Sequence, residues 1–153
     1  MKKRVFVLAI AVLLCVSCCF VACREEKNNN ASGTFSIVLD EPSGYKVYTL
    51  DVSIVKDNGI MDALKYLETN EGVVLDYTVS TYGAYFKRVG NVIENATNGS
   101  YVYFYTNKSS DFDVSAYATT FDYNGTLLTS SGLGVNSMTV QNGTIIVISL
   151  VTF

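Results

Sequence analysis

Polar and apolar positions alternate along the segment 45–55. The apolar residues that recur at every second position are Tyr48, Leu50, Val52 and Ile54. This period of two predicts a strand with one buried face. A shorter apolar run at residues 35–39 precedes it, and turn-forming residues fill positions 40–44. The two segments are therefore predicted to form a hairpin.

The apolar spacing becomes helical after residue 59. Ile60, Ala63, Leu64 and Leu67 recur at i, i+3, i+4 and i+7, which puts them on one face of a helix. Gly72 follows and is suited to end the helix in the left-handed conformation. A helix with one apolar stripe is expected to cover one face of a sheet.

The remaining residues are predicted to form strands joined by turns. The predicted strands are 73–80, 85–89, 92–93, 101–106, 114–123, 126–128 and 144–151. The last one is continuously apolar, which is typical of a strand that is buried on both faces near the centre of a sheet. Asn142-Gly143 is typical of a tight hairpin between this strand and residues 138–140.

The order of elements predicts an α+β fold for residues 34–153. A hairpin, a helix and then further strands, with the last strand central, fit a β-grasp-like mixed sheet packed on one helix. A small α+β sandwich of another kind is the alternative. The segment is long enough to bury a core without disulfides or metal.

The N-terminal residues have the character of an export signal. Lys2, Lys3 and Arg4 precede an uncharged apolar run that ends at Cys23, the order found in signal peptides. Val21-Ala22-Cys23, followed directly by charged residues, resembles the lipobox of bacterial lipoproteins. That resemblance implies cleavage before Cys23 and a lipid attached to Cys23.

The resulting division of the chain has three parts. Residues 1–22 are predicted to be a lipoprotein signal peptide, 23–33 a lipid-anchored flexible tether, and 34–153 the folded domain. Cys18 offers a competing register for the lipobox. An ordinary signal peptide and an uncleaved apolar anchor are the alternatives to lipidation. The predicted location is extracytoplasmic, on a bacterial cell membrane.

Composition excludes several classes of function. Residues 24–153 carry eight Lys and Arg against 14 Asp and Glu, a net charge of −6, which argues against nucleic acid as a partner. The same charge argues against adhesion to anionic lipid, so the membrane link is expected to come from the lipid anchor. The chain has no His, and Cys23 is the only cysteine beyond the signal. This removes Ser-His and Cys-His catalysis and the usual zinc sites.

We therefore expect a protein that is not an enzyme and has no metal or cofactor. The nearest pair of carboxylates, Asp111 and Asp113, leaves a cell-wall hydrolase as an alternative.

Tyrosines form the most distinctive chemical pattern of the domain. Tyr101, Tyr103 and Tyr105 stand at i, i+2 and i+4, so they share one face of a strand. Val102 and Phe104 are then expected to face the helix. Tyrosine combines a large rigid ring with a hydroxyl, which suits contacts with carbohydrate, peptide or planar ligands. The alternative is that these rings stabilise the outer side of a sheet through cross-strand pairs. The candidate ligand-binding residues are Tyr82, Tyr85, Tyr101, Tyr103, Tyr105 and Asn107.

Several short motifs resemble the β-grasp domain at the C-terminus of transcobalamin and intrinsic factor. The matching segments are residues 60–65, 82–89, 101–107 and 142–146, within a region of similarity from 45 to 153. Lys108 and Thr144 replace a Gly and an Asp of the family pattern, and residues 109–128 are an insertion. The resemblance implies a β-grasp fold and cobalamin as a candidate ligand. The helical domain that supplies the other half of the cobalamin site in those relatives is not found in this sequence.

These observations predict a non-catalytic binding or adhesion module, held by lipid outside the bacterial membrane. It would present a tyrosine-rich surface to a small ligand or to another surface protein. A cobalamin or corrinoid-binding protein that feeds an importer is the first alternative, and the hydrolase is the second.

Overall fold

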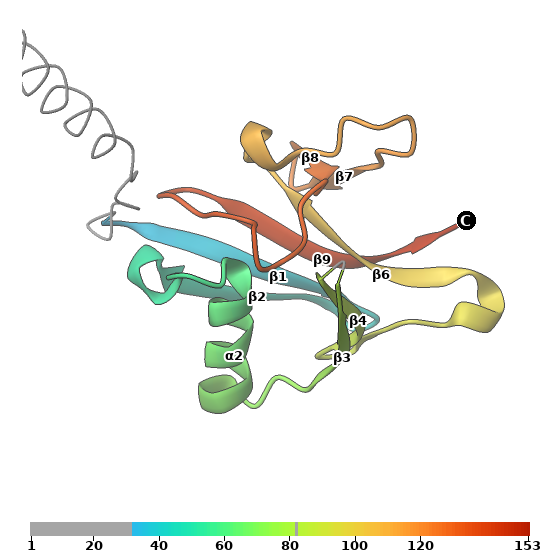
Figure 1. Cartoon of the computed structure of the whole chain (residues 1–153), viewed down its shortest axis with the longest axis horizontal. Helices are drawn as coiled ribbons and strands as arrows, with labels where there is room; N and C mark the ends of the chain where they lie inside the picture. Colours follow the sequence, from blue (N-terminus) through green and yellow to red (C-terminus); the bar gives the residue numbers. More distant parts are fainter. Residues whose placement is uncertain (1–31, 82) are drawn as a thin grey trace, which may run out of the picture.

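The computed structural model describes residues 32–81 and 83–153 (Figure 1). The predicted signal peptide, Cys23, most of the tether and Tyr82 lie outside these residues. No helix among the described residues is long and apolar enough to cross a membrane.

Two sheets and one α-helix make up the described part of the chain. The larger sheet has the order β2-β1-β9-β6-β8-β7, and the smaller has the order β3-β4-β5. The larger sheet is built from β1 (Thr34–Glu41), β2 (Gly44–Asp51), β6 (Ser100–Thr106), β7 (Thr120–Tyr123), β8 (Thr126–Ser130) and β9 (Ile145–Thr152). The smaller one contains β3 (Leu75–Ser80), β4 (Gly83–Val89) and β5 (Val92–Ile93), and the helix is α2 (Ile60–Glu71). Three short 3₁₀ turns complete the described elements: η1 (Val52–Ile54), η2 (Ala96–Asn98) and η3 (Ser109–Asp111).

The predicted α+β class is confirmed, with mostly sheet and one helix among the described residues. β1 and β2 form the predicted antiparallel hairpin, and β9 runs parallel to β1. β9 lies between β1 and β6, so the expectation of a central last strand is confirmed. The expectation of a single sheet is wrong, because β3, β4 and β5 pair only with each other.

The two faces of β9 explain its uninterrupted apolar sequence. Ile146 and Ile148 belong to the main core, which also contains the apolar stripe of α2. Val147, between them, belongs to a second cluster with Val38 and Leu128. Figure 1 shows α2 on one side of β1 and β9, and the β7–β8 pair, which belongs to the same sheet, on the other side. Both faces of β9 are therefore covered.

The helix begins and ends at glycines in unusual conformations. Gly72 adopts the left-handed conformation at φ 67°, and the Val73 N–H donates to the Leu67 carbonyl oxygen. At the other end, Gly59 has φ 56°, and a β-carbon there would lie 2.6 Å from the carbonyl oxygens of Val135 and Met138. Gly59 therefore allows the loop after β8 to pack against the start of the helix.

Two predicted strands are wrong. Of the segment 114–123, only residues 120–123 form a strand. Residues 138–140 form none, so the expected hairpin before β9 does not exist. Asn142-Gly143 instead contacts the start of β1. The Gly143 N–H donates to the Thr34 carbonyl oxygen, and the Thr34 N–H donates to the Asn142 side-chain oxygen at 3.0 Å.

Candidate functional site

The tyrosines of β6 share one sheet face, but they differ in exposure. Tyr105 is only 3% exposed and packs with Val147 and Leu128 in the second cluster. Burial raises the pKa of its hydroxyl, although a hydrogen bond from the Thr119 hydroxyl opposes this effect. The ring of Tyr105 therefore lies in the interior and not on an open surface. Its neighbours Tyr101 and Tyr103 are half-buried.

Tyr103 and Tyr85 line one pocket at the edge of β6. The pocket is open to the surface and has a volume of about 170 Å³. Its walls come from three segments: β4, β6 and the loop after β8. The lining residues are Ala84, Tyr85, Phe86, Val102, Tyr103, Phe104, Ser131, Leu133, Gly134 and Val135. None of them carries a charge, so the pocket suits a neutral or apolar group.

Tyr85 is fixed in place by the residue that follows β5. Its hydroxyl donates to a carboxylate oxygen of Glu94. This hydrogen bond, with a smaller contribution from burial, raises the pKa of Tyr85 to about 12. The phenol is therefore protonated at neutral pH, and the hydrogen bond ties this pocket-lining residue to Glu94.

Two other predicted residues, Tyr101 on β6 and Asn107 directly after it, lie outside the pocket. The ring of Tyr101 packs against Phe153 at a centroid distance of 6.3 Å. The side chain of Asn107 donates to the Gly143 carbonyl oxygen at 3.1 Å and accepts from the Ile145 N–H at 2.9 Å. Asn107 thus joins the end of β6 to the turn before β9, which is a structural role.

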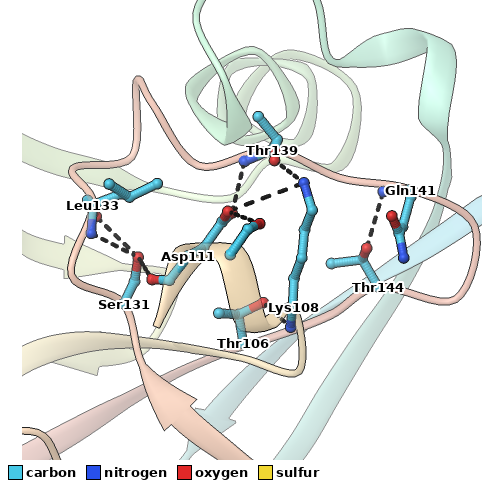
Figure 2. A network of polar contacts seen from close by, with 9 residues as sticks. Thr106, Lys108, Asp111, Ser131, Leu133, Thr139, Gln141 and Thr144 are labelled. Carbon is cyan, nitrogen blue, oxygen red and sulfur yellow. Dashed lines mark hydrogen bonds and ion pairs between the residues drawn. The ribbon is translucent and has the colours of Figure 1, made fainter. Parts of the chain in front are cut away.

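A buried carboxylate holds the third wall of the pocket. Asp111 is 2% exposed, and it accepts hydrogen bonds from the Thr139 N–H at 2.9 Å and the Ser110 hydroxyl at 2.7 Å. Its carbonyl oxygen also accepts from the Ser131 hydroxyl. Lys108 lies 4.0 Å from the carboxylate. Figure 2 shows these contacts between the segment after β6 and the loop after β8.

The carboxylates that suggested a hydrolase have structural partners. Asp111 makes the contacts described above, and Asp113 accepts from the Ser115 N–H at 2.8 Å. Neither residue lines the pocket. The described residues contain no cluster of three or more Asp, Glu, Cys or His that would hold a metal ion.

Several pocket residues were not predicted from the sequence. Leu133 and Val135 follow a glycine-containing turn and have no periodic pattern, so no local signal identifies them. Val135 nevertheless joins the main core together with Met138. Phe86 alternates correctly for a buried strand position, but the alternation alone does not reveal that its ring packs against Phe104, with centroids 5.4 Å apart.

No family model and no curated protein matches this chain. Several solved structures are similar to it in fold, and two of them serve as examples. One is a protein from Ruminococcus gnavus, provisionally described as metal-binding, with a TM-score of 0.51 and 11% identity, over 79% of this chain and 98% of that one. The other is haptocorrin in complex with Cbi, with a TM-score of 0.53 and 11% identity, over 80% of this chain and 26% of haptocorrin. At 11% identity, these similarities show a shared fold, and this chain spans about a quarter of haptocorrin.

Proposed function

We propose that this chain is a non-catalytic binding module with a β-grasp fold, anchored by lipid outside a bacterial membrane. The topology supports the β-grasp assignment. The hairpin β1–β2 is followed by α2, and β9 returns parallel to β1 in the middle of the sheet. Similarity in fold to a segment of haptocorrin also supports it.

One observation carries the binding function. Tyr85 and Tyr103 come from different sheets, and both line the uncharged pocket beside β6. A concave site with aromatic walls and a few polar groups is the usual form of a small-ligand site. Its volume of about 170 Å³ is below the usual range for a whole drug-sized ligand, so it suits one ring or side chain of a larger ligand.

The lining residues also support a role in binding without catalysis. None of the ten carries a carboxylate, an amine or an imidazole. Residues of these types perform most proton transfer in enzymes. The proposed module therefore recognises its ligand by shape and hydrogen bonding.

The binding site is testable on the full chain in detergent micelles, labelled with ¹⁵N. Small neutral probes, namely phenol and N-acetylglucosamine, are titrated and the backbone amide shifts are followed. We expect shifts at Tyr85, Val102 and Tyr103, with loss of binding in Tyr103→Ala. Tyr117→Ala is the matched control, because Tyr117 is 80% exposed and lies outside the pocket. Shifts confined to other surfaces would contradict the site.

The proposed anchor is a lipid on Cys23, on the basis of the lipobox-like sequence that precedes it. Mass spectrometry of protein purified from membranes is expected to show a chain that begins at a lipid-modified Cys23. The variant Cys23→Ser is expected to remain unlipidated. An unmodified Cys23 on the processed chain would overturn this part of the proposal.

A corrinoid is the second candidate ligand, because haptocorrin in complex with Cbi is similar in fold to this chain. In this version the protein would bind cobalamin outside the membrane and pass it to an importer. The visible absorption spectrum of cobalamin provides the test, with full-length protein added in excess. A spectral shift that disappears in Tyr103→Ala supports this candidate. An unchanged spectrum at high micromolar protein concentration contradicts it.

A further inference from the structure

The peptide groups of β6 point alternately to its two neighbours. In an antiparallel strand the N–H and C=O of one residue point to the same side, and those of the next residue point to the other side. The N–H of Asn107, the residue after β6, donates to the carbonyl oxygen of Ile145, the first residue of β9. The odd-numbered residues of β6 therefore point to β9. Ser100 exchanges hydrogen bonds with Asn95 on the opposite side. The even-numbered residues, including Val102 and Phe104, therefore point away from β9.

The strand on that opposite side covers only one end of β6. β8 pairs with β6 at two positions, Tyr105 with Ser130 and Thr106 with Thr129. Beyond them, the Ser131 N–H donates to the Phe104 carbonyl oxygen at 2.8 Å. No described strand pairs with β6 on this side between Phe104 and Ser100.

This gap leaves three backbone groups without a described partner. They are the N–H and C=O of Val102 and the N–H of Phe104. Their spacing is two residues, which is about 6.8 Å along a strand. A strand that lies alongside would present matching groups at the same spacing.

The tyrosine-lined pocket is lined by the same residues that border this gap. Val102, Tyr103 and Phe104 line it together with residues of β4 and of the loop at 131–135. The pocket therefore combines unpaired backbone groups with an uncharged hollow beside them. A ligand that satisfies both must carry alternating backbone donors and acceptors and an apolar side chain.

We propose that this gap binds a short extended peptide segment, which adds to β6 as a strand. The backbone of the segment pairs with Val102 and Phe104, and one aromatic or aliphatic side chain enters the pocket between Tyr85 and Leu133. The gap is closed by Asn95 at one end and by Ser131 at the other. The segment is therefore about three residues long, as at a chain end or the tip of a loop. Strand addition of this kind gains affinity from backbone hydrogen bonds and specificity from side-chain pockets.

This inference deepens the proposed binding function and rests on it, because both use the same pocket. The first test needs no ligand. In hydrogen exchange of the full chain in micelles, the amides of Val102 and Phe104 are expected to exchange faster than those of Tyr103 and Tyr105. Equal protection of all four would show that the edge is already occupied, and would overturn the inference.

The second test uses a defined probe, the blocked tripeptide acetyl-Val-Phe-Val-amide, and the same peptide with every amide N-methylated. The unmodified peptide is expected to shift the amides of Val102 and Phe104, and the N-methylated peptide is not. Leu133→Asp is expected to weaken binding by at least about tenfold, because it puts a charge in an apolar wall. Leu127→Asp, at a side chain that is 65% exposed on β8, is the matched control.

The outcomes separate the two proposals. Equal binding of both peptides overturns strand addition but leaves the pocket as a site for one ring. If neither peptide perturbs Val102 at millimolar concentration while phenol still shifts Tyr103, strand addition is overturned and the pocket remains a binding site. If no probe shifts any pocket residue, the binding site itself fails.

Discussion

Tyr45 and Tyr123 lie on opposite edge strands of the six-stranded sheet, yet their ring centroids are only 5.1 Å apart, with an angle of 73° between the ring planes. Phe121 also contacts Tyr45, at 6.4 Å. A flat sheet of six strands would hold its edges far apart, at about 4.8 Å per strand. The sheet is therefore strongly curled, and the curl encloses Tyr105 and Leu128.

Removing one ring of this contact should loosen the curl. We expect Tyr123→Ala to lower the free energy of unfolding by about 1–2 kcal/mol. An edge-to-face aromatic pair stabilises the fold beyond what the burial of its apolar area contributes. Chemical denaturation followed by tyrosine fluorescence measures the loss. Tyr117→Ala, at an 80% exposed residue, is the control, with an expected change below about 0.5 kcal/mol. Equal effects of the two substitutions would contradict the role of the contact.

Gly59 and Gly72 provide a matched pair at the two ends of α2. Both have positive φ, but a β-carbon at Gly72 meets nothing within 4 Å, whereas one at Gly59 meets two carbonyl oxygens at 2.6 Å. Gly72→Ala should cost about 1–2 kcal/mol, the strain of the left-handed conformation alone. Gly59→Ala should cost more, because the backbone of the loop must also move. Thermal unfolding of both variants gives the comparison, and a smaller loss for Gly59→Ala would refute this explanation.

Asp111 should control the rigidity of the pocket wall. Asp111→Ala removes a buried carboxylate and with it the acceptor of the Thr139 N–H. We expect the loss of this hydrogen bond to a charged group to cost about 1.5–3 kcal/mol. The amide of Thr139 should then exchange hydrogen faster with solvent, as measured by nuclear magnetic resonance. Asp111→Asn retains one acceptor oxygen and should lose less stability. Unchanged protection of Thr139 in Asp111→Ala would show that the loop is held by other contacts.

The hydrogen bond between Tyr85 and Glu94 should be visible as a displaced titration. Replacement of Glu94 by Gln should lower the pKa of Tyr85 from about 12 towards the ordinary value of 10.0. The hydrogen bond stabilises the folded protein only while the Tyr85 hydroxyl is protonated. Because the pKa of Tyr85 is raised in the folded state, this stabilisation is fully present below pH 10 and is lost as the pH rises through about 12. A ¹³C-labelled tyrosine ring reports this titration. Identical curves for the two proteins would mean that the bond does not form in solution.

Residue spacing along the chain correctly predicted those elements that depend only on neighbouring residues. The helical stripe from Ile60 to Leu67 is a spacing of apolar residues, and Gly72 ends the helix through its own backbone conformation. The period of two correctly put the tyrosines of β6 on one face. It also put Val102 and Phe104 with the main core that contains α2.

Contacts between distant segments were beyond such patterns. Asn142-Gly143 has the residues of a tight hairpin, but its hydrogen bonds go to Thr34, more than 100 residues earlier. Tyr105 has the same residue type and spacing as Tyr103, yet the β7–β8 pair covers it. A turn or strand motif states which conformation a segment prefers, and does not state what packs against it.

The sequence by itself determined the strand and helix periods, the central place of β9 and the common face of the tyrosines. These features follow from the positions of the apolar residues within one strand or helix, because apolar side chains are buried away from water. Only the tertiary structure decided that Tyr85 and Tyr103 meet in one pocket while Tyr105 is enclosed. That outcome depends on the curl of the larger sheet and on the loop held by Asp111, and both are contacts between residues far apart in the chain.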